Sequence, residues 1–344
     1  MSRAIFFLLF IKMSFVVYSQ NANDYYRMAS EKYKKKNFIG SSVDYTKAIE
    51  LSPDAAALYN NRGLCYVKLE KWDKAELDFV KALKLDPSYK QALLNMGNMF
   101  SAKLEYELAV LNYDKALALD SLYKKVFAKK AYVLYQLEDY NEALRFYDKA
   151  INSSPVKKDI LFNARGATYE KLGLFDEAIY DYDITLNLNP KSHATYINRG
   201  ILKTKKKQFE EAIKDFTVAQ SFSGMNGAGY YYRGLCRIGQ LDEIRTSKEK
   251  HFVLDIKENQ KIIQMACSDF KKSKSMSYGS SFEAYQEYCT DETKMGVITS
   301  KEKKKRKTVD KVIIKDVVME DRILTPPTNK ESKKKRRSNT FNQR

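Results

Sequence analysis

A motif that returns every 34 or 35 residues constrains this 344-residue chain more than any other feature. The motif is marked by a small residue, which recurs at Ala29, Gly63, Gly97, Ala131, Gly166, Gly200 and Gly234. A period of this length is the size of one supersecondary unit, which buries its apolar face only by stacking on neighbouring copies. The sequence therefore predicts a stacked array instead of a domain with one central core.

Three further positions recur in register with the first. A second short residue follows twelve residues later, at Ser41, Ala75, Ala109, Ala143, Ala178 and Ala212. An aromatic residue comes four residues after that, at Tyr45, Phe79, Tyr113, Tyr147, Tyr182 and Phe216. A third short residue follows at Ala48, Ala82, Ala116, Ala150, Thr185 and Ala219. Four units close with proline, at Pro53, Pro87, Pro155 and Pro190, and Ser121 replaces it once.

These positions predict an all-α chain of antiparallel helix pairs. The first small residue lets the second helix approach closely, and the aromatic residue fills the space between one repeat and the next. Proline ends the second helix because it lacks an N–H and clashes with the preceding turn. The residues between these positions are charged or carry amides, so we expect them to face water.

The repeat resembles the tetratricopeptide repeat family. GLCYVKLEKWDKAELDFVKALKLDP (Gly63–Pro87) and GATYEKLGLFDEAIYDYDITLNLNP (Gly166–Pro190) are two close examples. The resemblance covers about seven repeats over residues 22–290. It implies a right-handed superhelical solenoid whose first helices line a concave groove. It also implies a non-catalytic scaffold that binds a protein or peptide there.

If the family geometry applies, amides, lysines and tyrosines of the first helices face the groove. By register they are Asn60, Asn61, Lys68, Asn95, Asn98, Tyr132, Asn163, Lys171, Asn198, Lys205, Tyr231 and Tyr232. Amides can hydrogen bond with an extended peptide backbone, and tyrosines give contact area at low entropic cost. Alternatively, some of the asparagines cap or bridge neighbouring repeats. The lysine and asparagine set with which some family members hold a C-terminal carboxylate is not intact in this sequence.

The seventh unit departs from the pattern. Its second-helix alanine falls at Ala266, about 20 residues late, which implies an insertion near residues 241–260. The insertion is either a lengthened connection between helices or a loop that binds a partner. A capping helix is expected near residues 281–289. This ending resembles that of exported bacterial repeat proteins, and by that resemblance Cys267 and Cys289 pair; the alternative is two free thiols. Cys65 and Cys236 are five repeats apart and cannot pair.

The N-terminal residues 1–19 resemble a secretory signal peptide, with Arg3 before an apolar run and small residues before Gln20. Lys12 interrupts the run, so an uncleaved anchor and an ordinary apolar start remain alternatives. We expect an exported protein, periplasmic or associated with the envelope; the alternative is cytoplasmic. Export would permit disulfides.

Residues 291–344 form a basic tail that we expect to be largely disordered. They carry 17 Lys or Arg and 8 Asp or Glu, which is a net +9 of the chain's +18. Runs such as Lys301–Lys307 and Lys333–Arg337 repel themselves and stay solvated. The tail is a solvated extension, or it attaches the protein to an anionic surface, or it binds nucleic acid; export argues against the last.

The sequence contains no catalytic, metal-binding or cofactor motif. Its two histidines, His193 and His251, lack metal spacing, and the glycine-rich Ser223–Tyr232 lacks the ending that binds phosphates. The carboxylates are expected on exposed helical faces beside lysines. We therefore predict no enzyme and no cofactor. The leading hypothesis is a scaffold in the assembly of a cell-envelope complex. The alternatives are an adaptor attached by its tail and a cytosolic regulator associated with nucleic acid.

Overall fold

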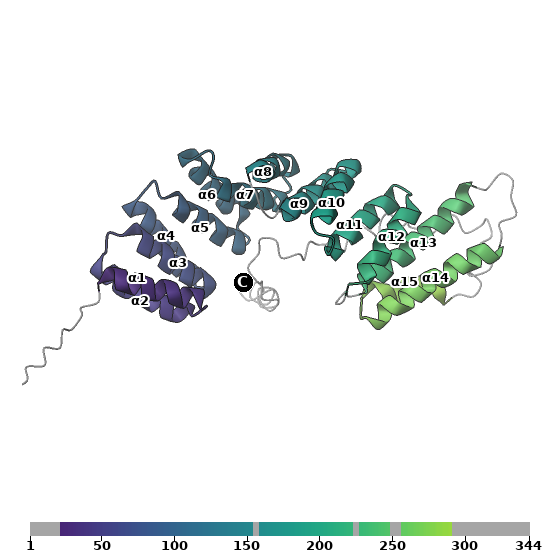
Figure 1. The fold of residues 1–344 in the computed structure, drawn as a ribbon, viewed down its shortest axis with the longest axis horizontal. Coiled ribbons are helices and arrows are strands. Elements are labelled where there is room, and N and C mark those ends of the chain that lie inside the picture. Colours follow the sequence, from purple (N-terminus) through teal and green to yellow (C-terminus); the bar gives the residue numbers. More distant parts are fainter. Residues whose placement is uncertain (1–20, 154–157, 223–226, 248–255, 291–344) are drawn as a thin grey trace, which may run out of the picture. The chain divides into compact units, whose positions relative to one another are not determined.

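A computed structural model describes residues 21–153, 158–222, 227–247 and 256–290. The signal-like segment and the basic tail lie outside these residues. The described residues contain fifteen α-helices and no strand (Figure 1). They are α1 (Ala22–Lys34), α2 (Phe38–Leu51), α3 (Ala56–Lys68), α4 (Trp72–Leu85), α5 (Lys90–Ala102), α6 (Tyr106–Leu119), α7 (Lys124–Gln136), α8 (Tyr140–Ser153), α9 (Lys158–Lys171), α10 (Phe175–Leu188), α11 (His193–Lys205), α12 (Phe209–Gln220), α13 (Ala228–Ser247), α14 (Ile256–Ser275) and α15 (Ser280–Cys289).

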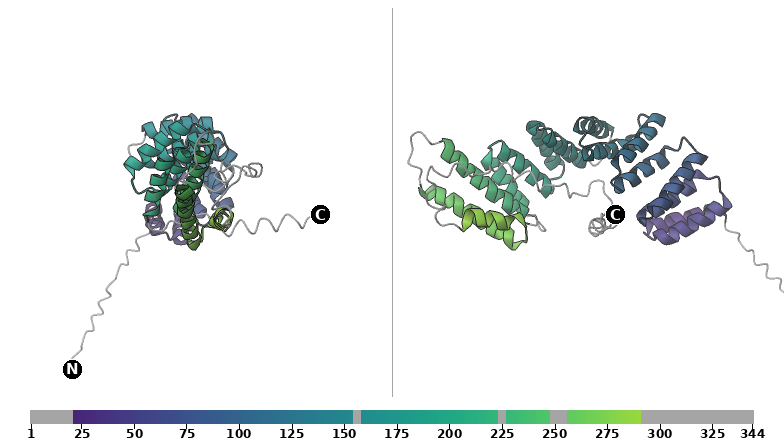
Figure 2. Two further views of the ribbon diagram at one scale, coloured as in Figure 1. Left: turned by 90° about the vertical axis from the view of Figure 1, so that its right-hand side faces the viewer. Right: turned by 180° about the vertical axis from the view of Figure 1, so that it is seen from behind.

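The chain divides into two compact units between Ser121 and Leu122. Unit 1 contains α1–α6 and unit 2 contains α7–α15. In each unit consecutive helices pack as pairs, and each second helix also contacts the first helix of the next pair (Figure 2). The prediction of an all-α array of helix pairs is confirmed.

The first helix of a pair ends in a tight left-handed turn. In the α3–α4 turn, Glu70 has φ 55° and the Lys71 N–H donates to the carbonyl of Tyr66. This is the hydrogen bond of a Schellman motif, which satisfies carbonyls at a helix end. The α9–α10 turn places glycine, Gly173, at the same position with φ 76°. Because the turn is this short, the second helix folds straight back along the first.

The second helices end where the prolines predict. Pro53, Pro87 and Pro190 each lie two residues after the last residue of α2, α4 and α10. Proline disfavours the helical conformation of the residue before it, so the helix stops there. Pro155 lies outside the described residues. Ser121 follows α6 at the same distance, so the boundary between the two units falls where the proline is missing.

Each recurrent glycine lies under an aromatic ring of its own pair. A Cβ atom added at Gly97 would come within 2.5 Å of the Tyr113 ring, and one at Gly200 within 2.8 Å of Phe216. The ring also meets the next repeat, as predicted from the sequence, since Phe216 stacks on Tyr232 of α13 with ring centroids 6.1 Å apart. The glycine therefore sets how near the two helices lie, because no side chain separates backbone from ring.

The seventh pair is longer than the others. α13 and α14 have 20 residues each, whereas the preceding helices have 12 to 14. Phe270 of α14 lies against Gly234, as Phe216 lies against Gly200, so the late alanine and aromatic residue fall in register. Leu241, Ile262 and Ile263 form a small apolar cluster in the added length. The described part of the predicted insertion is therefore helix; residues 248–255, with His251 and Phe252, lie outside the described residues.

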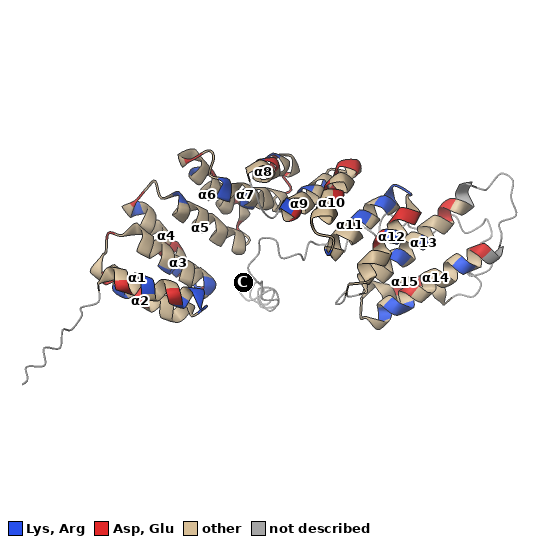
Figure 3. Ribbon diagram, viewed as in Figure 1, with Lys and Arg blue, Asp and Glu red and all other residues tan. Residues whose placement is uncertain are grey.

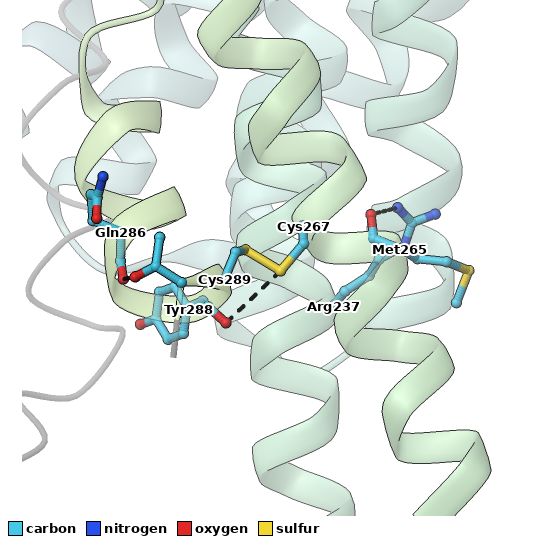
Figure 4. The surroundings of a disulfide bond; sticks show 7 residues. Arg237, Met265, Cys267, Gln286, Tyr288 and Cys289 are labelled. Atoms are coloured by element: carbon cyan, nitrogen blue, oxygen red, sulfur yellow. Dashed lines mark hydrogen bonds between the residues drawn. A yellow bond between two sulfur atoms is a disulfide. The ribbon is translucent and has the colours of Figure 1, made fainter. Parts of the chain in front are cut away.

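A disulfide fastens the last helix to the array. Cys267 of α14 and Cys289 at the end of α15 are bonded, with an S–S distance of 2.07 Å (Figure 4). The bond closes a segment whose ends are 22 residues apart. Ala284 of α15 is buried in the same cluster as Phe270, so α15 covers the end of the apolar core. Cys65 and Cys236 are free and buried.

The state of the four cysteines gives a direct prediction. Burial raises the pKa of the Cys236 thiol to about 11, and it also raises the pKa of the Cys65 thiol. Both thiols are therefore protonated at pH 8 and out of contact with solvent, so iodoacetamide should label neither in the native protein. After unfolding, two sites should label without reductant and four with it, as counted by intact mass. Four labels without reductant would contradict the disulfide.

Candidate functional site

Four arginines of the first helices pair with buried aspartates of the second helices. Arg62 donates to Asp78, Arg165 to Asp181, and Arg199 to Asp215, each through Nε and Nη2 over 2.5–2.9 Å. Arg233 makes the same two-pronged contact with Asp269. Two parallel hydrogen bonds fix the orientation of the guanidinium relative to the carboxylate, in addition to the attraction between the two charges. The expectation that carboxylates lie on exposed faces is therefore wrong for these four aspartates.

Sequence reasoning missed these pairs, although the signal was present. An arginine immediately precedes Gly63, Gly166, Gly200 and Gly234, and an aspartate immediately precedes the aromatic residue of the second helix. Burial still raises the pKa of Asp78 and Asp181, while the arginine hydrogen bonds lower it in part. Each pair locks the two helices of one repeat together, so we assign them to structure and not to ligand binding.

In unit 1 the amides predicted to face a ligand form a chain between two first helices. Asn95 of α5 donates to Asn60 of α3 over 2.8 Å, Asn60 donates to Asn61 over 3.0 Å, and Gln91 donates to Asn95 over 3.0 Å. Asn60 and Asn95 are buried, with 2% and 5% of their surface exposed. These two residues therefore bridge repeats, the alternative noted from the sequence, and are withdrawn as ligand contacts.

Other predicted residues of unit 1 remain accessible. Asn61 is half-buried and Lys68 is exposed, and both lie on α3. Asn98 of α5 is half-buried and accepts a hydrogen bond from Tyr113 over 2.9 Å. α3 and α5 are in contact, so the three side chains belong to neighbouring helices of one unit. We call Asn61, Lys68 and Asn98 the unit 1 face.

The asparagines predicted in unit 2 are also buried between repeats. Asn163 is 7% exposed and accepts a hydrogen bond from Thr195 over 2.8 Å. Asn198 is 8% exposed and hydrogen bonds with Tyr182. Lys205 forms an ion pair with Glu170 of the preceding repeat at 3.2 Å. These three side chains hold neighbouring repeats together.

The tyrosines predicted for the last repeat are part of the core. Tyr231 and Tyr232 are 2% and 4% exposed, and their ring centroids are 5.1 Å apart. Tyr231 also contacts Phe270 and Tyr278. The prediction that these two residues contact a ligand is corrected, because the last helices cover them. Lys171 is exposed and Tyr132 is half-buried in unit 2.

Acidic and basic residues are interspersed along the helices of both units (Figure 3). Among the described residues, no group of three or more His, Cys, Asp or Glu is arranged to hold a metal ion. None of the described helices combines the length and apolar character needed to cross a bilayer.

The paired helices, their repeat length and their stacked cores define a helical-repeat protein. Profiles described as tetratricopeptide repeat match residues 56–89 and 125–157. The chain therefore contains tetratricopeptide repeats. The repeats support a protein–protein interaction scaffold as its general class.

Similar solved structures have the same fold. A tetratricopeptide repeat protein from Parabacteroides merdae is 18% identical, with a TM-score of 0.52, covering 78% of this chain and 96% of its own. PilF of Pseudomonas aeruginosa is 23% identical, with a TM-score of 0.51 and coverages of 69% and 97%. The C-terminal part of a repeat-containing protein from Cytophaga hutchinsonii is 16% identical, with a TM-score of 0.57 and coverages of 75% and 98%.

A curated relative is similar over a short stretch. The E3 ubiquitin-protein ligase CHIP of Arabidopsis thaliana is 47% identical over 45 residues, which is 13% of this chain. The chain spans 16% of that protein's length. A match of this length covers little more than one repeat. The similarity therefore concerns the repeat and says nothing about ligase activity.

Proposed function

We propose that this protein is a non-catalytic scaffold that binds an extended acidic peptide on the unit 1 face. The proposal rests on a set of side-chain hydrogen-bond donors on that face to which no described residue bonds. Asn98 Oδ1 is occupied by Tyr113, and Asn61 Oδ1 by Asn60. No described residue bonds to the amide nitrogens of Asn61 and Asn98 or forms an ion pair with Lys68. The side-chain atoms of this face without a bond, the two amide nitrogens and the Lys68 ammonium, are all donors.

A face whose unbonded side-chain atoms are donors favours a ligand rich in acceptors. Carbonyl oxygens of an extended backbone suit the two amide NH₂ groups, and a carboxylate suits the Lys68 ammonium. Leu64, half-buried on α3 between Asn61 and Lys68, adds apolar contact at the same face. A peptide with acidic side chains therefore matches the face better than a basic or uncharged one.

A peptide array tests this proposal on the full chain. We expect acidic 12-residue peptides to bind better than basic ones, and Asn61→Ala and Lys68→Ala each to weaken that binding about tenfold, which corresponds to one lost hydrogen bond to a charged or buried partner. Lys84→Ala, an exposed lysine of α4 in the same unit, is the control and should bind like the unchanged protein. If all three variants bind equally, the face is not the binding site.

We also propose that the protein is exported and acts in the assembly of a cell-envelope complex. Two observations support export: the Cys267–Cys289 disulfide, which persists in oxidising compartments, and the signal-like pattern of residues 1–19. The intact mass of the protein from fractionated cells tests it. A chain starting at Gln20 outside the cytosol supports export, and a full-length chain in the cytosol overturns it.

The charge of residues 291–344 favours a second candidate function, attachment to an anionic surface. The net +9 of this segment is half of the charge of the chain. If it supplies the attachment, deleting residues 301–344 releases the protein from anionic vesicles, and binding of the full chain falls as salt rises. Retention of the shortened chain would exclude this function.

A further inference from the structure

The arginines of unit 2 show how an additional carboxylate is held beside an Arg–Asp pair. Besides its own aspartate, Arg165 donates through Nη1 to Asp148 of the preceding second helix over 2.6 Å. Arg199 donates in the same way to Asp183 over 2.6 Å. The side chains of Asp148 and Asp183 are 48% exposed. The Nη1 edge of these arginines is therefore a place where a carboxylate can arrive from solvent.

The seventh repeat lacks this additional carboxylate. Arg233 Nη1 donates instead to the hydroxyl of Thr217, over 3.0 Å, at the position that Asp183 occupies one repeat earlier. Thr217 lies on α12 and is exposed. The ring of Tyr230 lies 5.6 Å from the Arg233 guanidinium and flanks it. The arginine, its aromatic neighbour and its paired aspartate are all retained, and the second carboxylate alone is missing.

The seventh repeat has a second cation beside Arg233. Arg237 donates to the same Asp269 carboxylate as Arg233, and to the backbone carbonyl of Met265 over 3.2 Å (Figure 4). Asp269 is the one carboxylate of the described residues that contacts either arginine. The side chains of Arg233 and Arg237 are 15% and 14% exposed. The cluster therefore holds two positive charges and one negative charge.

The sixth repeat is a balanced version of the same cluster. Lys203 takes the place of Arg237 and contacts Asp215 at 2.9 Å, so Arg199 and Lys203 face the two carboxylates of Asp215 and Asp183. Burial lowers the pKa of Arg237, and nearby Arg233 lowers it further against the attraction of Asp269. An excess of positive charge in a largely buried cluster is costly, and a carboxylate that balances the excess lowers the cost.

We propose that Arg233 and Thr217 form a binding site for a carboxylate side chain of a partner protein, on the second-helix side of unit 2. The carboxylate would take the place that Asp148 and Asp183 fill in the two preceding repeats. It would accept from Arg233 Nη1 in place of the Thr217 hydroxyl, and from that hydroxyl once it rotates away from the carbonyl of Ile213, to which it donates over 2.7 Å. A monoanion balances the cluster, so the ligand is a glutamate or aspartate side chain. The site is separate from the unit 1 face and does not depend on it.

The chain offers a variant that fills the site from within. Thr217→Asp restores the carboxylate of the preceding repeats, so we expect it to raise the Tm of the full chain by about 2–4 °C. It should also weaken the binding of a fluorescein-labelled hexaglutamate peptide about tenfold, measured by anisotropy. Thr46→Asp is the matched control, because Thr46 contacts Arg62 over 3.1 Å in the same way but that arginine faces one aspartate without a second cation. Thr46→Asp adds the same negative charge, and it should change the Tm and the affinity for hexaglutamate much less than Thr217→Asp does.

The reverse change should open a second site. Asp183→Thr removes the additional carboxylate beside Arg199 and Lys203, and it should strengthen hexaglutamate binding severalfold. The basic tail is present in every variant, so its contribution to the affinity is constant. The proposal is overturned if Thr217→Asp lowers the Tm, if it weakens binding no more than Thr46→Asp does, or if Asp183→Thr leaves the affinity unchanged.

Discussion

Replacing Asp215 with alanine is expected to lower the free energy of unfolding of unit 2 by about 3–5 kcal/mol, the cost of removing one partner of a buried ion pair. Asp215 is 4% exposed and holds Arg199 through two hydrogen bonds, while Lys203 contacts the same carboxylate. Alanine would leave Arg199 with the half-exposed Asp183 alone and Lys203 without the carboxylate that it contacts. Urea unfolding followed by circular dichroism measures the loss.

The control for this change is Asp183→Ala. Asp183 contacts the same arginine at 2.6 Å, but its side chain is 48% exposed. Solvent screens such a pair, so the expected loss is about 1 kcal/mol or less. Equal losses for Asp183→Ala and Asp215→Ala would show that the buried pair is not what holds the two helices of the repeat together.

Tyr182→Ala is the second change with a large expected effect. The Tyr182 ring is fully buried and lies over Gly166, where an added Cβ would come within 2.9 Å of it. Its hydroxyl bonds with Glu170 over 3.3 Å and with Asn198 of the next repeat. Removing a buried aromatic side chain costs about 3–5 kcal/mol. Repeats contact only their neighbours, so hydrogen exchange should quicken most in α9, α10 and α11.

Tyr180→Ala provides the comparison on the same helix. Tyr180 is two residues before Tyr182 on α10 and is 65% exposed. Truncating an exposed side chain changes stability by about 0.5 kcal/mol or less. A large loss with Tyr180→Ala, or a small one with Tyr182→Ala, would contradict the assignment of the recurrent aromatic position to the core.

The sequence was sufficient to predict the helix pairs because their spacing is a property of the backbone. Gly200 and Phe216 must meet wherever a second helix folds back along a first one, and Pro190 must follow the helix end. Phe270 fell in register across about 20 additional residues for the same reason. These positions depend on contacts within one repeat, which a period of 34 residues specifies directly.

The candidate site was predicted less well because accessibility depends on what the neighbouring repeat supplies. Asn60 and Asn95 occupy positions that the sequence predicts to face a ligand, but each lies within reach of the other and they bond together. Tyr231 and Tyr232 are covered because Tyr278 and the last helices pack against them. The Arg–Asp pairs were missed because a single charged residue in a helix is ordinarily solvated. In the sequence, a buried Arg–Asp pair differs from solvated charges only because both partners recur, the arginine before the glycine and the aspartate before the aromatic residue.

Photocrosslinking tests directly whether an acidic peptide binds at the unit 1 face. p-Benzoylphenylalanine placed at Leu64, on α3 between Asn61 and Lys68, would be irradiated with an acidic 12-residue peptide selected on the full chain. The same group placed at Leu77, an α4 residue that is 70% exposed, serves as the comparison. We expect strong crosslinking at position 64, which Lys68→Ala shifts to about tenfold higher peptide concentration, and little crosslinking at position 77. Equal crosslinking at both positions, or crosslinking at position 64 that Lys68→Ala leaves unchanged, would contradict binding at the unit 1 face.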